Sequence, residues 1–216
     1  KTRRYGQKAV VFAVTHDAPH ENISTEVHRA GGPFTLVPLP DLDGLPCSSV
    51  VWMEHGPEAL RLSQLDTASF EAAAFDRSAG LYGRLKLASP RGVWPIISQI
   101  ADEIIGPRMA LVAEAAHVMP PIGAQGLNMS LRDMASLLDL ATASPDTLGD
   151  RTMLDSYARA RHSDIKLRIA GIDALNRASI AGGPLAQELR AQGIKLLYGL
   201  SPVRRKLMEL GLGAGR

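Results

Sequence analysis

Short apolar runs alternate with turn residues in the first half of the chain, a pattern typical of an antiparallel β-sheet. The predicted strands are residues 9–15, Thr25–Arg29, 33–37 and 48–53. The turn signal Gly31-Gly32-Pro33 separates the second strand from the third. Residues 38–46 are rich in side chains that fix turn dihedrals, so we expect an exposed connection between two strands there.

Shorter elements are predicted after this sheet. Asp66 is a candidate N-cap for a short helix that extends through Phe75. Residues 84–87 alternate like a strand, and Trp94 opens another extended segment.

The pattern changes after Gly106 and Pro107. Residues 109–113 predict a buried strand, residues 115–126 a loop that contains glycine, and a helix follows from about Leu127. One stripe of this helix is apolar, so we expect it to pack against another element. The stripe consists of Leu127, Leu131, Met134, Ala135 and Leu138.

The remainder of the chain is predicted to be helical. A long helix is expected over residues 152–179, and Gly182-Gly183-Pro184 is expected to end it. Its apolar side carries Leu154, Tyr157, Ile165, Ile169, Ile172 and Leu175. A further helical stretch is predicted over residues 185–197, and a short one after Pro202.

Composition narrows the class of protein. With 45% hydrophobic and 21% charged residues among 216, the chain is neither collagen-like, nor disordered, nor a disulfide scaffold. Its longest strongly apolar stretch, residues 9–14, is far shorter than the roughly 18 residues of a membrane-spanning helix. Cys47 is the only cysteine, which excludes an internal disulfide and a thiolate zinc cluster and favours the reducing cytoplasm.

The net charge of +2 hides an asymmetry between the two ends. Residues 1–150 carry 12 basic and 17 acidic side chains, whereas residues 151–216 carry 12 basic and 5 acidic ones. A basic end can bind nucleic acid, an anionic membrane face or an acidic partner. Because acids are interleaved with the basic residues, solvated helix faces are the simpler interpretation. We expect no nucleic-acid partner.

The loop before the predicted helix at Leu127 is the most informative segment. A helix that starts after small residues exposes unpaired N–H groups at the positive end of its dipole, where an anion or a polarised carbonyl binds. Gly123 and Gly126 allow a ligand to approach the backbone closely. A tight connection without a ligand is the alternative. The glycine-rich end, residues 211–215, lacks dinucleotide spacing and a following helix.

Residues 108–133 resemble the second flavin-binding motif of FAD-dependent aromatic-ring monooxygenases, and most closely the ubiquinone-biosynthesis hydroxylases. In that family a Gly-Asp pair ends a strand, Ala-Ala-His follows, and a Pro-x-x-Gly-Gln-Gly-x-Asn loop leads into a helix with an Asp. The matching positions are Ala113-Glu114, Ala115-Ala116-His117, Pro121 through Asn128, and Asp133. Ala113, Glu114 and Ala124 depart from the Gly, Asp and Gly that the family usually has.

The resemblance implies an α/β fold, the back part of a Rossmann-like FAD/NAD(P)-binding monooxygenase. It implies a substrate-domain antiparallel sheet over residues 1–100, the flavin motif over residues 101–145 and C-terminal helices over residues 146–216. The family's N-terminal G-x-G-x-x-G unit does not occur in this sequence. Because residue 1 is Lys, we expect a front part of the protein to be absent.

The resemblance also implies a reaction: FAD, NAD(P)H and O2 hydroxylate an aromatic substrate, a polyprenylated phenol in this branch. No side chain is assigned a catalytic role, because oxygen activation belongs to the flavin. Glu114 would bond a hydroxyl of FAD. The residues implied to line the isoalloxazine are Pro121, Gly123, Ala124, Gln125, Gly126, Leu127 and Asn128.

Other candidates have simpler interpretations. His16 and His20 are expected to make structural hydrogen bonds rather than to bind a metal. His117 is expected to anchor the loop. Trp52 and Trp94 are expected to be core residues, and the alternative is that they lie beside an aromatic substrate. The alternative function is a flavin-less interaction module or an inactive fragment, whose basic C-terminal helices bind a biosynthetic complex or a membrane surface.

Overall fold

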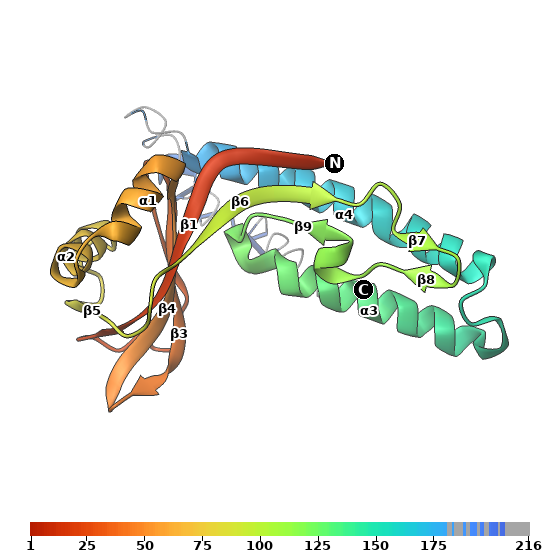
Figure 1. Cartoon of the computed structure of the whole chain (residues 1–216), viewed down its shortest axis with the longest axis horizontal. Coiled ribbons are helices and arrows are strands. Elements are labelled where there is room, and N and C mark those ends of the chain that lie inside the picture. Colours follow the sequence, from red (N-terminus) through yellow and green to blue (C-terminus); the bar gives the residue numbers. More distant parts are fainter. Residues whose placement is uncertain are drawn as a thin grey trace. The chain divides into compact units, whose positions relative to one another are not determined.

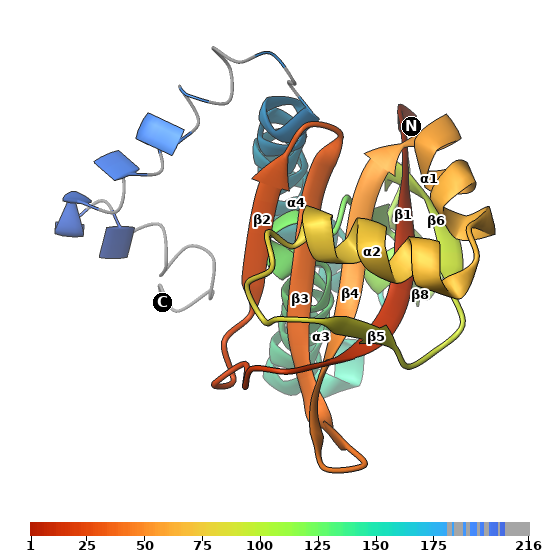
Figure 2. The ribbon, with the colours of Figure 1, turned by 90° about the vertical axis from the view of Figure 1, so that its left-hand side faces the viewer.

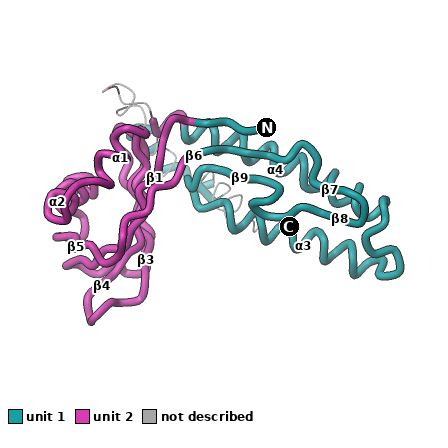
Figure 3. Tube along the Cα trace, in the orientation of Figure 1, with its two compact units in different colours: residues 1–4, 97–176, 190–216 teal, residues 5–96, 177–189 magenta. Residues whose placement is uncertain are grey.

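Two compact units make up the chain (Figure 3), and each is described by itself. The computed structural model describes residues 1–180, 183, 188, 191–193, 195–196, 199–202 and 204–205. Unit 1 comprises residues 1–4, 97–176 and 190–216, and unit 2 comprises residues 5–96 and 177–189. Figure 1 labels the elements along the chain.

Unit 2 is built on an antiparallel sheet, as the alternating apolar runs predict. Its strands are β1 (Thr2–His16), β2 (Thr25–Arg29), β3 (Gly32–Leu42), β4 (Leu45–His55) and β5 (Leu85–Leu87). They run in the order β2-β3-β4-β1, and β5 also pairs with β1. The five strands predicted for this part of the chain are therefore confirmed.

The connection predicted at residues 38–46 is wrong, because most of it is strand. β3 continues to Leu42 and β4 starts at Leu45, and these two residues pair. The turn itself is Asp43-Gly44, with φ angles of +51° and +77°. Two left-handed residues suit a tight hairpin whose twist matches that of its strands. The prolines suggest a longer turn, but this Asp-Gly pair alone reverses the chain. The predicted exposure of the segment is confirmed.

Two helices, α1 (Gly56–Gln64) and α2 (Thr67–Arg77), cover one face of this sheet (Figure 2). The sequence pattern did not predict α1. The start of α2 is confirmed, because the Asp66 carboxylate accepts a hydrogen bond from the Ser69 amide at 3.0 Å. The core beneath the helices contains the aromatic residues Phe12, Phe34, Trp52 and Phe70. Trp52 is 4% exposed, which confirms it as a core residue.

Unit 1 combines short strands with two long helices. Its strands are β6 (Gly92–Ile100), whose first residues belong to unit 2, β7 (Ile105–Gly106), β8 (Met109–Ala110) and β9 (His117–Val118). Its helices are α3 (Gln125–Ala143), α4 (Arg151–Ile180) and the 3-10 turns η1 (Ala113–Ala115), η2 (Ile122–Ala124) and η3 (Pro145–Thr147). β6 pairs with β9 and β7 with β8, both antiparallel. The extended segment predicted at Trp94 is confirmed as β6.

The buried strand predicted at residues 109–113 is wrong. Only Met109–Ala110 form a strand, and Met109 is 51% exposed. The backbone at Ala113 has φ +55°, a left-handed value at which a strand cannot continue. Ala113 is instead the first residue of η1, so the segment that leads to the loop is a 3-10 turn rather than an extended strand.

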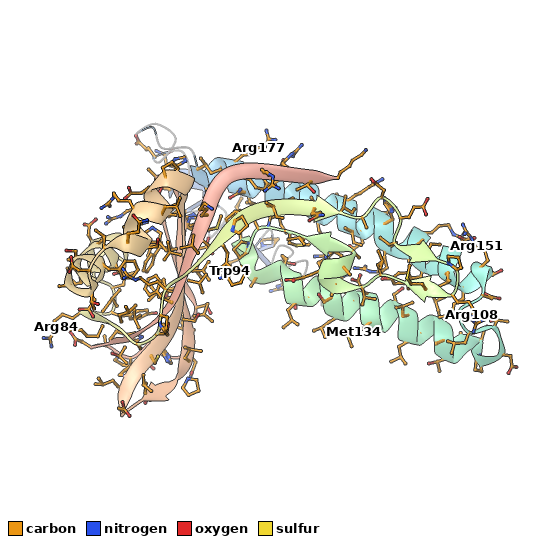
Figure 4. The ribbon with its side chains drawn as sticks, in the orientation of Figure 1. Arg84, Trp94, Arg108, Met134, Arg151 and Arg177 are labelled. Atoms are coloured by element: carbon orange, nitrogen blue, oxygen red, sulfur yellow. The ribbon has the colours of Figure 1, made fainter. Side chains whose placement is uncertain are left out.

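The helix predicted from Leu127 is confirmed as α3, which begins two residues earlier, but the prediction for its apolar stripe is wrong. Leu127, Leu131, Met134 and Leu138 are between 51% and 70% exposed, and Figure 4 shows Met134 projecting outward from α3. The buried residues of α3 are Met129 and Asp133. The helix thus turns a partly polar face inward, toward ionic contacts described below.

The long helix predicted over residues 152–179 is confirmed as α4. Leu154, Tyr157, Ile165 and Ile172 are buried as expected, whereas Leu175 is 58% exposed. The predicted stop at residues 182–184, the helical stretch at 185–197, the segment after Pro202 and the glycine-rich end fall mainly on residues outside the described part. Within the described part, no helix is both long enough and apolar enough to cross a membrane.

Candidate functional site

Asp133 of α3 holds together the segment that precedes the loop. Its carboxylate is fully buried and accepts three hydrogen bonds. The Ala113 amide donates to Oδ2 at 2.9 Å, His117 Nε2 is 2.8 Å from the same oxygen, and Arg161 Nε of α4 donates to Oδ1 at 2.7 Å. His117 is itself buried, so its contact with Asp133 confirms the predicted anchoring role.

Asp133 and Arg161 form an ion pair at neutral pH. Burial by itself raises the pKa of Asp133, but the hydrogen bonds, that of His117 foremost, outweigh burial and hold this pKa below its ordinary value. Burial likewise lowers the pKa of Arg161, but the bonds to Asp133 and Asp164 outweigh it and raise this pKa. Breaking such a buried pair from one side leaves an uncompensated charge.

Polar contacts continue from this pair along α4 and reach the loop. Arg161 Nη1 donates to Asp164 Oδ2 at 2.7 Å, and Arg168 Nε donates to Asp164 Oδ1 at 3.0 Å. Arg168 Nη1 then donates to Gln125 Oε1 at 3.3 Å, and Gln125 Nε2 donates to the Gly123 carbonyl at 2.9 Å. We call the side chains of Asp133, Arg161, Asp164 and Arg168 the ionic ladder.

The charge pattern predicts that Asp164 and the basic residues around it lie on solvated helix faces, and it does not single out Arg161 or Arg168. The spacing of these three residues along α4 was the signal that could have found them. Residues three and seven positions apart share one face of a helix, so the three side chains of α4 point the same way.

The loop itself lies open at the surface. Its exposed residues are Pro121, Gly123, Ala124, Gly126 and Leu127, whereas Ile122 is buried and Gln125 and Asn128 are half-buried. A Cβ added to Gly123 or Gly126 would meet no atom within 4 Å. The backbone there is thus accessible to a ligand from outside, as the sequence interpretation requires.

Two departures from the family motif fall on left-handed backbone. Ala113 has φ +55° and Ala124 has φ +50°. These are the positions where the family usually has glycine, the residue that adopts such angles without strain. Glu114 follows Ala113 in η1 and is exposed, so its carboxylate is free of burial.

The residues present fit the electron-rich edge of a flavin. α3 begins at Gln125, so the amides of its first turn are the ones that no intrahelical carbonyl accepts, and they carry partial positive charge. No Cβ stands over the Gly126 backbone beside them. An open, electropositive helix start is the chemistry that a partly anionic ring requires.

A pocket of about 320 Å³ in unit 1 is separate from this loop. It lies among the start of β1, the end of β6 and α4, and includes Arg3, Lys166 and Asp173. Neither Glu114 nor any residue of 121–128 lines it.

The other candidate residues are the histidines and tryptophans that the sequence singles out outside the loop. His16 Nδ1 lies 2.8 Å from the Ala18 carbonyl and Nε2 lies 2.9 Å from Ser48 Oγ, so both ring nitrogens are engaged. His20 Nε2 lies 3.2 Å from the Leu39 carbonyl. Trp94 is 64% exposed, so the prediction of a core residue is wrong, and the alternative that it borders a substrate stays a prediction.

Comparison with known proteins places these features in a family. The family model of the FAD binding domain matches residues 14–168. Ubiquinone hydroxylase UbiL of Rhodospirillum rubrum is 32% identical over 99% of this chain and 49% of its own length. The mitochondrial ubiquinone biosynthesis monooxygenase COQ6 of Xenopus tropicalis is 29% identical over 93% of this chain and 50% of its own length.

The fold agrees with a solved structure. OxyS anhydrotetracycline hydroxylase from Streptomyces rimosus superposes with a TM-score of 0.65 at 19% identity, over 99% of this chain and 42% of that one. The mixed α/β architecture with an antiparallel sheet is therefore shared with that hydroxylase. The chain spans about half the length of the curated relatives it matches. The relatives of the chain include ubiquinone-biosynthesis hydroxylases. Because the family model matches most of its residues, the chain belongs to the FAD binding domain family, whose cofactor is FAD.

Proposed function

We propose that the protein hydroxylates an aromatic substrate with FAD, NAD(P)H and O2, and that the substrate is a polyprenylated phenol of the ubiquinone type. The observation that carries this proposal is the open, glycine-bearing turn at the start of α3. The names of the relatives support the substrate class, since they are a ubiquinone hydroxylase and a ubiquinone biosynthesis monooxygenase.

Each residue of the site has a proposed task. Glu114 accepts a hydrogen bond from a hydroxyl of FAD, because its carboxylate is exposed beside the loop segment. Pro121, Gly123, Ala124, Gln125, Gly126, Leu127 and Asn128 line the isoalloxazine. The first-turn amides of α3 stabilise negative charge on the ring without a titrating side chain. FAD, when bound, supplies the oxygen activation.

The three segments of the chain expected from the sequence have proposed tasks as well. Residues 1–100 would form the substrate-domain sheet, residues 101–145 the flavin motif and residues 146–216 a helical region. The exposed stripe on α3 supports an interaction face there, because contiguous apolar surface marks such faces. That face would pack against the dinucleotide-binding unit of the family.

A flavin assay tests the function. The native protein should copurify with flavin or bind added FAD, and a prenylated phenol should stimulate its oxidation of NAD(P)H. Glu114→Gln should weaken FAD binding about tenfold, the effect of one charge-assisted hydrogen bond. Glu103→Gln, an exposed acid of the same unit, is the matched control and should bind as the native protein does. A native protein without flavin that gains none from added FAD contradicts the proposal.

The cytoplasm, with peripheral contact at the inner membrane face, is the proposed location. A lipid-linked substrate requires access to a membrane, and the basic residues of 151–216 would provide the contact. Binding to anionic vesicles should therefore weaken as salt is raised. Binding that does not respond to salt counts against this contact.

A further inference from the structure

The ionic ladder joins the two segments to which flavin contacts are assigned. At one end, Asp133 accepts the Ala113 amide and so fixes η1, where Glu114 lies. At the other end, Arg168 bonds Gln125, which in turn bonds the Gly123 carbonyl in the loop. Every member of this path belongs to unit 1.

The ladder is shielded from water along its length. Side-chain exposure is 0% for Asp133, 6% for Arg161, 25% for Asp164 and 17% for Arg168. Acidic and basic groups alternate, so each charge has an opposite neighbour. Burial raises the pKa of Asp164, but its bonds to Arg161 and Arg168 outweigh burial and lower it. Shielded, charge-assisted bonds of this kind hold geometry more firmly than exposed ion pairs do.

The loop needs such support because its backbone is strained at Ala124 and its surface is open. Gly123 and Ala124 are both left-handed, at φ +69° and +50°. Gln125 follows them as the first residue of α3. Its amide is oriented by two partners, with Nε2 toward the Gly123 carbonyl and Oε1 toward Arg168. Fixing this amide fixes where the loop ends and the helix begins.

We propose that Arg168 is a positioning residue for the flavin loop. By holding Gln125 it sets the direction of the α3 first turn, and through Asp164, Arg161 and Asp133 the same ladder sets the spacing between this turn and Glu114. This inference rests on the proposed function for its ligand, but its effect on the loop exists without flavin.

The test uses the native protein and three variants of α4. Arg168→Met removes both donors, Arg168→Lys keeps the charge but cannot bond Asp164 and Gln125 as a fork, and Arg159→Met is the matched control at an exposed position of the same helix. The readouts are hydrogen exchange of peptides that cover residues 121–128 without added FAD, the Kd for FAD, and the visible circular dichroism of bound flavin.

We expect Arg168→Met to speed exchange in the loop several-fold, to weaken FAD binding about tenfold and to change the flavin dichroism. Arg168→Lys should recover part of each effect, and Arg159→Met should match the native protein. If Arg168→Met does not fold, Arg168→Lys carries the test, with intermediate values expected.

Native exchange and native flavin dichroism in both Arg168 variants would overturn the inference. Equal effects of Arg168→Met and Arg159→Met would also overturn it. A native protein that binds no FAD overturns the proposed function instead, and the exchange readout then still decides whether Arg168 positions the loop.

Discussion

Two alanines of the candidate site show how single residues affect the free energy of the backbone. Ala113 and Ala124 both occupy left-handed backbone, at φ +55° and +50°. An L-residue in this region costs roughly 1–2 kcal/mol relative to right-handed backbone. The sequence alone identifies both as departures from the family motif, but only the backbone shows why glycine is usual there.

Ala113→Gly should therefore stabilise the protein. Relief of left-handed strain exceeds the extra entropy that glycine has in the unfolded chain, and we expect a net gain of about 1 kcal/mol. Ala135→Gly, in the interior of α3, is the control and should lose about 1 kcal/mol. Unfolding in urea measures both, and a loss of stability in Ala113→Gly would show that this strain is absent.

At the scale of elements, periodicity predicted α4 and the strands of unit 2 because one side of each is buried against neighbours in the chain. It failed for α3. The sequence pattern of Leu127, Leu131, Met134 and Leu138 predicts that this face of α3 packs against another element. It does not indicate which element that is. The face turned inward carries Asp133, whose three donors come from distant segments.

The candidate site likewise has one part that the sequence predicts and one part that it does not. The loop 121–128 and the start of α3 were predictable, because glycine and proline act locally on the backbone. The ionic ladder was not, because its bond from Arg161 to Asp133 and its contact with Gln125 join residues 28 and 43 positions apart. A motif names the residues near a ligand, whereas only the fold shows what holds them.

Tyr157 provides a test of how α4 docks. Its hydroxyl donates to the Leu111 carbonyl at 2.8 Å, and burial, then the charge of Asp133, raises its pKa to about 12. The unfolded chain loses this proton near pH 10, so the stabilising effect is complete below about pH 10 and is lost as pH rises toward 12.

Tyr157→Phe should lower stability by about 1–2 kcal/mol at neutral pH, because the Leu111 carbonyl loses its donor. The same variant should flatten the decline in stability between pH 10 and about 12. Denaturant unfolding across this pH range measures both effects. An alkaline decline of native steepness in Tyr157→Phe would mean that another group causes it.

At the scale of the whole molecule, the exposed apolar stripe on α3 is the main surface feature to be explained. The chain covers about half of each relative described above. An apolar face of four large residues is more than scattered surface hydrophobicity requires. We therefore expect the stripe to be an interaction face.

Studied by itself, the 216-residue chain should associate through this face. Replacing both Leu131 and Leu138 by Asp should reduce self-association in sedimentation experiments, because it breaks the apolar surface without removing buried contacts. Leu60→Asp, at a position of α1 that is 44% exposed, should leave association unchanged. Association that persists in the double variant would assign it to another surface.

Gly126 allows the most direct test of the claim that a flavin ring lies at the start of α3. A Cβ at this position meets nothing within 4 Å, so Gly126→Val should fold with nearly native stability yet block the approach of a ligand to the backbone. Gly171→Val in α4 is the matched control, since a Cβ there also meets nothing. We predict that Gly126→Val weakens FAD binding about tenfold or more while Gly171→Val does not. Native FAD affinity in a folded Gly126→Val protein would contradict the account.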